Sequence, residues 1–164
     1  MKRFFNDDLT IAVSSGIAAT LIKNCVSVLL KIFGLKRYIY WQLAASVFLD
    51  ASQAWGAAGL LIGFLVDLTV AALLGIIFFY VLRYTGKQHH WAKAAMGGFF
   101  IWVGITGLSP SLGISKIALT DIPTVIAFLI TDTLFSYLVV YFIMRFGKEY
   151  LPDQRHPGQK IERS

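Results

Sequence analysis

Three charged side chains lie inside long apolar stretches of this sequence, where an ionisable group is costly unless it has a partner or a wet cavity. Lys23, Asp67 and Asp132 each fall in a different stretch. If the stretches cross a membrane in alternating directions, each charged residue lies ten residues from the end of its own stretch, and these three ends face the same side of the membrane. Opposite charges at one depth in hydrocarbon face one another inside a bundle. We therefore expect Lys23 to pair with at least one of the two aspartates.

One lysine cannot neutralise two carboxylates, which limits the chemistry of such a cluster. Either the cluster keeps a net negative charge, or one aspartate is protonated at neutral pH. Groups that touch would titrate as a coupled unit. A site for a proton or a cation is one hypothesis. The favoured interpretation is structural, because a buried Lys–Asp–Asp set also fixes which helices are neighbours.

Other polar and small residues recur on the same helical faces. Asn24 and Ser136 are predicted to belong to the buried polar cluster, next to Lys23 and Asp132 respectively. Small residues spaced by four let helix backbones approach closely in lipid. The predicted helix-packing positions are Gly16, Gly59, Gly63, Ala71, Gly75, Gly97 and Gly104.

The elements that position these residues follow from composition. The chain has 164 residues, of which 57% are hydrophobic and only 15% are charged, with a mean hydropathy of +0.67. These values exclude an ordinary soluble domain, and the apolar residues form runs long enough to span a bilayer. We predict an all-α, polytopic membrane protein with a four-helix transmembrane bundle, one membrane domain over residues 1–146 and a disordered cytoplasmic tail over 147–164. The predicted spans are 9–33, 57–84, 91–108 and 122–146.

Local signals place the ends of these spans. Gly34 is expected to stop the first span, and Ser109-Pro110 the third, because proline cannot continue the hydrogen-bonded helix. Asp121 is placed as an N-cap of the fourth span, with Pro123 in its first turn.

Aromatic residues bracket the segment between the first two spans. Such residues anchor chains at the membrane–water interface. We expect a short interfacial helix over residues 40–53 that lies on, or dips into, the outer face, most simply as a connector. The predicted interface anchors are Tyr38, Tyr40, Trp41, Trp55 and Trp91.

The basic residues are distributed unevenly between the two predicted sides. The side that carries both ends of the chain and the loop 83–93 holds ten of them, and the other side holds four: Lys31, Lys36, Arg37 and Lys116. This positive-inside bias predicts a multi-pass protein of the cell (plasma) membrane with both termini cytoplasmic. The net charge of +6 is then an orientation signal and a contact with anionic lipid. No nucleic-acid partner is expected.

Several other chemistries are disfavoured. The single Cys25 cannot form an intrachain disulfide. His89 and His90 do not share a helical face, so no metal site is expected. Intramembrane aspartyl proteases resemble one another in a Gly-x-Gly-Asp motif, which neither Asp67 nor Asp132 has, and a serine elbow is also missing. We expect no enzyme activity and no cofactor.

We also expect no cleaved signal peptide. Asp7 and Asp8 lie between the basic residues at the N-terminus and the first apolar stretch, where a signal peptide has no acidic residues.

The order of elements resembles small four-span membrane proteins of unknown function from Gram-positive bacteria, of the YqhR-like kind. The resemblance rests on the Gly- and Ala-rich first span, the aromatic outer segment, the turn into Trp91-Ala92, and the span 97–108 that ends in Ser-Pro. It implies a bacterial inner membrane and brings no activity or functional residues.

Two functions remain open. The first, and favoured, is a structural or partner-binding membrane subunit, which includes a possible homo-oligomer packed through the glycine faces. The second is a small proton- or cation-linked carrier or channel that uses Lys23, Asp67 and Asp132. A carrier needs a cavity that reaches the charges from one side, whereas a purely structural cluster is closed and fully paired.

Overall fold

The computed structural model describes residues 8–50, 52–117, 119–147 and 151, and these residues form helices and no strands. Four helices, over residues 8–32, 57–85, 90–111 and 122–146, are long and apolar enough to cross a membrane. This confirms the predicted all-α bundle of four spans. The elements in chain order are α1 (Asp8–Ile32), α2 (Tyr40–Ala45), the 3₁₀ turn η1 (Gln53–Trp55), α3 (Ala57–Thr85), α4 (His90–Trp102), the π-helical segment η2 (Val103–Leu108), α5 (Ser109–Ser111) and α6 (Ile122–Phe146).

Two of the predicted helix ends have the expected local chemistry. After α1, Gly34 takes a positive φ of 75°, its N–H bonds to the Lys31 carbonyl, and the Leu35 N–H bonds to the Leu30 carbonyl. This paired pattern closes a helix at a glycine. Before α6, the carboxylate of Asp121 accepts a hydrogen bond from the Thr124 N–H at 3.0 Å, as an N-cap does.

The third span does not stop at Ser109-Pro110, which corrects the prediction. Residues 103–108 form a π-helix, in which the Ser109 N–H bonds to the Gly104 carbonyl five residues back, and one more helical turn follows to Ser111. Pro110 takes an N-terminal position of that last turn. The proline therefore lies in the last turn of a continuous helix, where its missing N–H removes no backbone hydrogen bond beyond its own.

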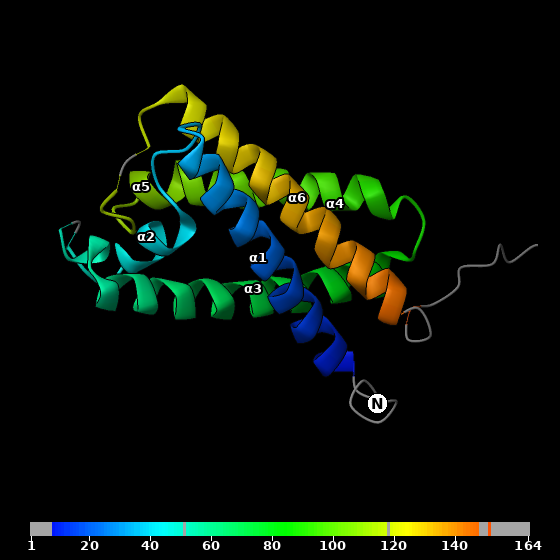
Figure 1. Cartoon of the computed structure of the whole chain (residues 1–164). Helices are drawn as coiled ribbons and strands as arrows, with labels where there is room; N and C mark the ends of the chain where they lie inside the picture. Colours follow the sequence, from blue (N-terminus) through cyan, green and yellow to red (C-terminus); the bar gives the residue numbers. More distant parts are fainter. Residues whose placement is uncertain (1–7, 51, 118, 148–150, 152–164) are drawn as a thin grey trace, which may run out of the picture.

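The helices pack in the spatial order α3, α1, α6, α4 (Figure 1). At the α1–α3 crossing, a Cβ on Gly16 would meet the backbone of Ala71, and a Cβ on Gly75 would meet the backbone of Ala12. Only glycine permits this approach, which brings α1 close enough for its side chains to reach Asp67. Among the described residues α3 packs only weakly against α4, so the bundle is less tightly closed between these two helices.

The other predicted packing positions divide into two groups. Gly59 and Gly63 pack against the chain of residues 41–54, and Gly97 lies against the ring of Phe78. Gly104 has nothing within 4 Å of an added Cβ, so its predicted packing role is wrong. Gly98, which the sequence analysis did not name, takes that role on α4: a Cβ there would lie 2.7 Å from the Cα of Thr133 on α6.

The segment between the first two spans differs most from the prediction. Its helix ends at Ala45 instead of continuing to residue 53, and it packs against α3 inside the bundle instead of lying on its face. Ser46 ends it, because its hydroxyl bonds back to the Leu43 carbonyl at 2.7 Å and to the Ser115 hydroxyl at 2.9 Å. Burial of Tyr40 and Leu43 draws the helix inward, since together with Phe128 they form a small core.

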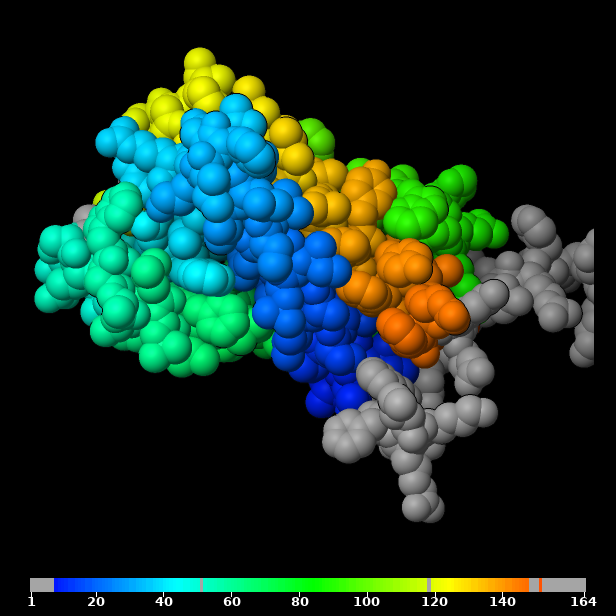
Figure 2. Space-filling view, in the orientation of Figure 1, coloured from blue at the N-terminus to red at the C-terminus, as the bar shows by residue number. Residues whose placement is uncertain are grey.

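We call the end of the bundle that holds α2 the α2 end, and the opposite end the terminal end. At the terminal end α1 begins, α6 ends, and Arg83 forms an ion pair with Asp8 (Figure 1). Along the face in Figure 2, α1 and α6 lie against one another and close the interior on that side. The tail that was predicted to be disordered lies outside the described residues, apart from Gly147 and Leu151.

Candidate functional site

Lys23 and Asp67 form a buried ion pair between α1 and α3. The Lys23 Nζ lies 2.8 Å from Asp67 Oδ1, and the two residues are 4% and 8% exposed. The other oxygen of the same carboxylate accepts hydrogen bonds from Asn24 Nδ2 at 2.7 Å and from Thr20 Oγ1 at 3.3 Å. Both oxygens of the Asp67 carboxylate are therefore bonded by donors from α1.

Asp132 on α6 belongs to the same interior but has a different partner. Its Oδ1 accepts a hydrogen bond of 2.6 Å from the hydroxyl of Tyr40, and its buried Oδ2 has no hydrogen-bond partner among the described residues. The Lys23 Nζ lies 3.6 Å from the centre of the Tyr40 ring. Burial, together with the neighbouring Asp132 carboxylate, holds the pKa of Tyr40 well above its usual value, so this hydroxyl keeps its proton.

Lys36 is a second buried lysine, which the sequence analysis placed on the outer side as an orientation charge. It is only 2% exposed, and its Nζ donates to Ser27 Oγ at 2.9 Å and to Thr131 Oγ1 at 3.4 Å. The ammonium also lies 4.0 Å from the ring centre of Tyr40 and 3.6 Å from that of Phe128. Ring faces attract cations, which offsets part of the loss of hydration.

The second lysine changes the charge balance of the site. We call Lys23, Lys36, Tyr40, Asp67 and Asp132 the charged cluster. Two ammonium groups now face two carboxylates, so the choice inferred from one lysine, between a net negative charge and a protonated aspartate, is no longer forced. With both lysines protonated and both aspartates ionised, the cluster is neutral overall, and one proton can move from a lysine to an aspartate without changing that sum.

Burial makes Lys36 sensitive to pH. Desolvation lowers its pKa from 10.5 to about 7, although the Asp132 carboxylate opposes the shift. Between these two values the unfolded chain holds a proton at Lys36 that the folded chain has lost, so the free energy of unfolding should rise with pH in this window. Below pH 7 the contribution should be flat. We therefore expect the free energy of unfolding of the wild type, relative to that of Lys36→Met, to be flat below pH 7 and to rise above it. Unfolding in detergent at each pH measures this difference, and parallel pH profiles of the two proteins would contradict the prediction.

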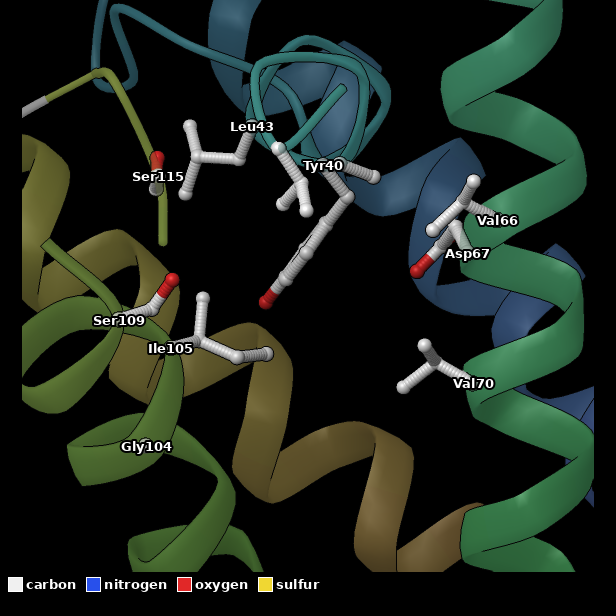
Figure 3. Close-up of a pocket in the computed structure, with 11 residues that line it drawn as sticks. Tyr40, Leu43, Val66, Asp67, Val70, Gly104, Ile105, Ser109 and Ser115 are labelled. Carbon is white, nitrogen blue, oxygen red and sulfur yellow. The ribbon is translucent and has the colours of Figure 1, made fainter. Parts of the chain in front are cut away.

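A pocket of about 200 Å³ reaches the charged cluster from the α2 end, between α3 and the π-helical segment η2 (Figure 3). The hydroxyl of Tyr40 and the carboxylate of Asp67 point into it, and Ser109 and Ser115 add hydroxyls on the opposite wall. Gly104 also lines it, so the glycine without a packing partner serves here to leave space. Short π-helical segments often occur at functional sites.

A smaller void of about 20 Å³ lies directly behind the pocket. Lys23, Asp67 and Asp132 line it together with apolar residues, and it shares Asp67, Val70 and Ile105 with the pocket wall. Its volume is sufficient for one water molecule or a small ion. On the terminal side the described residues that line the void are apolar, including Ala71 and Phe135, and a largely apolar pocket of about 340 Å³ between α3 and α4 shares Leu74 and Ile101 with it.

The remaining predicted residues are placed as follows. Asn24 lies in the cluster, whereas the Ser136 hydroxyl donates to the backbone carbonyl of Asp132 at 3.0 Å, and no bond from it to a charged side chain is described. Tyr40 is wrong as an interface anchor, because it is 3% exposed and bonded inside the bundle. Trp55 and Trp91 are each 47% exposed, and Tyr38 and Trp41 are half-buried.

Four members of the network were not identified from the sequence: Thr20, Lys36, Thr131 and the hydroxyl role of Tyr40. The signal of Thr131 is weak, since a threonine in an apolar helix usually bonds to its own backbone, and the Thr131 hydroxyl also lies within hydrogen-bonding distance of the Ala127 carbonyl, at 2.8 Å.

No protein-family model, curated protein or solved structure matches this chain.

Proposed function

We propose that this multi-pass membrane protein is a small carrier of protons or monovalent cations, which bind at the charged cluster. The observation that carries the proposal is the pocket of about 200 Å³ that contacts Asp67 and Tyr40. A cluster with a purely structural role would be sealed and fully paired. Here one side is open to a cavity, and one carboxylate oxygen of Asp132 has no hydrogen-bond partner among the described residues.

The uneven lining of the interior favours a carrier over an open channel. The pocket at the α2 end brings polar side chains to the charges, whereas the described residues that line the void on its terminal side are apolar. A carrier holds its site near the middle of the bilayer and opens it to one side at a time. The weak contact between α3 and α4 identifies the pair of helices whose relative movement would change access.

Gly104 and Gly107 offer a matched test of the pocket. Both lie in η2 and have nothing within 4 Å of an added Cβ, but only Gly104 lines the pocket. We expect Gly104→Leu to lower ion flux several-fold because its side chain fills the cavity, and Gly107→Leu to leave flux close to that of the wild type. Flux is measured in proteoliposomes with an entrapped pH dye and with sodium or potassium gradients. A wild-type protein that carries none of these ions would overturn the proposal.

The structural interpretation has its own supporting observation, which is the complete pairing of Asp67 by Lys23, Asn24 and Thr20. A membrane subunit that binds a partner protein or a second copy of itself therefore stays the second candidate function. Flux distinguishes the two, since a subunit of this kind moves no ions by itself.

We further propose that the protein lies in the cell membrane of a bacterium, surrounded by the lipid bilayer, with both termini in the cytoplasm. Ten basic residues on the terminal side against four on the other support this orientation. Because the Lys36 side chain is buried, only three of those four basic residues remain available at the surface, which strengthens the positive-inside bias. The YqhR-like resemblance is the support for a bacterial inner membrane. In this orientation the pocket opens away from the cytoplasm.

A further inference from the structure

Four polar groups form one continuous hydrogen-bonded chain through the interior of the α2 end. The Lys36 Nζ lies 3.4 Å from Thr131 Oγ1, which lies 2.6 Å from the Tyr40 hydroxyl, which in turn lies 2.6 Å from Asp132 Oδ1. All four residues are at most 3% exposed. The chain begins at a buried ammonium and ends at a buried carboxylate.

The donors and acceptors fit only one direction while Asp132 is ionised. A phenol has a single proton, and the Tyr40 proton is directed to Asp132. Thr131 must then donate to the Tyr40 oxygen, and it accepts from Lys36 because an ammonium can only donate. Every bond in the chain therefore runs from Lys36 towards Asp132.

The same geometry also fits the reverse direction. If Asp132 is protonated, its O–H donates to the Tyr40 oxygen and Tyr40 donates to Thr131. The Thr131 hydroxyl then turns to the backbone carbonyl of Ala127 at 2.8 Å or of Phe128 at 3.1 Å. Each of the two protonation states thus has a fully directed set of hydrogen bonds on one set of atoms.

We propose that Lys36, Thr131, Tyr40 and Asp132 form a proton relay, so that the ion handled by this protein is a proton. The inference rests on the proposed function and makes it specific. In one transfer, the Lys36 ammonium gives a proton to Thr131, Thr131 gives its own to Tyr40, and Tyr40 gives its own to the Asp132 carboxylate. The result is a neutral amine and a carboxylic acid, so one N–H bond breaks, one carboxyl O–H bond forms, and the net charge is unchanged.

The surroundings of Asp132 favour such an exchange. It faces Lys23 from α1, Lys36 from the segment between α1 and α2, Tyr40 from α2 and Asp67 from α3. Among the described residues, α4 and η2 present only the apolar Ile101 and Ile105, respectively, to the void. Asp132, whose Oδ2 has no hydrogen-bond partner among the described residues, lines the void together with Asp67, and through this void the proton reaches the pocket. The buried amine of Lys36 is also close to its titration point at neutral pH, since its pKa is about 7.

The test removes single hydroxyls from the relay. Thr131→Val deletes the hydroxyl and Thr131→Ser retains it, so the first should lower proton flux in proteoliposomes at least about tenfold and the second should retain most of it. Tyr40→Phe, which keeps the ring beside both lysines, should behave like Thr131→Val. The control Tyr38→Phe removes a hydroxyl outside the relay and should conduct normally.

If wild type conducts protons and Thr131→Val conducts equally well, the relay is wrong and the carrier proposal stands. If wild type carries only sodium or potassium, the relay is also wrong.

Infrared difference spectra recorded between about pH 5 and about pH 9 test the relay without flux. The carboxylic acid band that Asp132→Asn removes should change with the same midpoint as the phenol band that Tyr40→Phe removes, because protonation of Asp132 reverses the Tyr40 hydrogen bond. A wild type that conducts no ion but shows this joint titration would overturn the proposed function and leave the relay standing. An Asp132 band that titrates while the Tyr40 band is unchanged would overturn the relay.

Discussion

Replacing Lys23 with methionine should cost the fold about 3–5 kcal/mol, because it leaves the Asp67 carboxylate buried without its ammonium partner. Asn24 and Thr20 would still donate to one oxygen, but the other loses a bond of 2.8 Å and its counter-charge. The loss should be measured as the change in free energy of unfolding in detergent micelles. It is the largest effect on stability that the structure predicts.

The double variant Lys23→Met with Asp67→Leu separates the ion pair from the packing around it. Removing both charges leaves no uncompensated carboxylate, and such replacements of buried pairs are often neutral. We therefore expect the double variant to recover most of the stability that the single variant loses. A double variant as unstable as Lys23→Met would show that the lysine stem, and not the charge pair, holds α1 to α3.

The pair Lys116–Asp50 provides a geometric control for this experiment. Its N–O distance is also 2.8 Å, but the two side chains are 45% and 74% exposed. Water screens such a pair, so Lys116→Met should have no measurable effect on unfolding. Equal effects of Lys23→Met and Lys116→Met would contradict the importance of burial in this argument.

The helical registers were sufficient to predict that Lys23 pairs with an aspartate. The length of each apolar run fixes where its helix crosses the membrane, and so it fixes the depth of each charge. Which aspartate receives the lysine depends on the distance between helix axes. That distance is short between α1 and α3, because Gly16 and Gly75 let the backbones touch. Such a crossing is a tertiary property, and the glycine spacing alone did not distinguish it from that of Gly104.

Lys36 and Tyr40 were misplaced for a common physical reason. Each combines an apolar part with a polar tip, which suits the membrane–water interface as well as a polar interior. Lys36 follows the end of α1 and precedes Arg37. Arg37 is exposed, as charged residues just after a helix usually are. The fold of residues 33–39 turns one of these two side chains inward and the other outward. Nothing in the local sequence distinguishes them, because the buried position is created by Thr131 and Phe128 on a helix almost a hundred residues away.

The π-helical segment shows a similar limit. A run that contains Gly104, Gly107 and Pro110 indicates a weakened helix, and the helix end was predicted at Ser109-Pro110 because of the proline. In the structure the helix widens instead and continues to Ser111. The glycines matter through the space they leave beside α3, which appears only when the neighbouring helices are in place.

Asp132→Asn should abolish proton flux while it preserves the fold. The asparagine oxygen can still accept the 2.6 Å bond from Tyr40, and the side chain has nearly the same shape. Lys36, whose pKa is lowered to about 7 by burial, can release its proton and keep the cluster neutral, so the bundle should assemble as before. The amide cannot bind or release a proton near neutral pH. Flux measured with an entrapped pH dye, under a potassium diffusion potential, should fall at least about tenfold, to the level of protein-free vesicles.

Two comparisons decide whether this loss reports on the ion site. Asp50→Asn removes an exposed carboxylate at the α2 end and should conduct like the wild type. The melting temperature of Asp132→Asn should stay close to that of the wild type, which would exclude misfolding as the cause. An Asp132→Asn protein that is folded and still conducts protons would remove Asp132 from the site and leave Asp67, beside the pocket, as the one membrane-embedded carboxylate in the charged cluster to carry the ion.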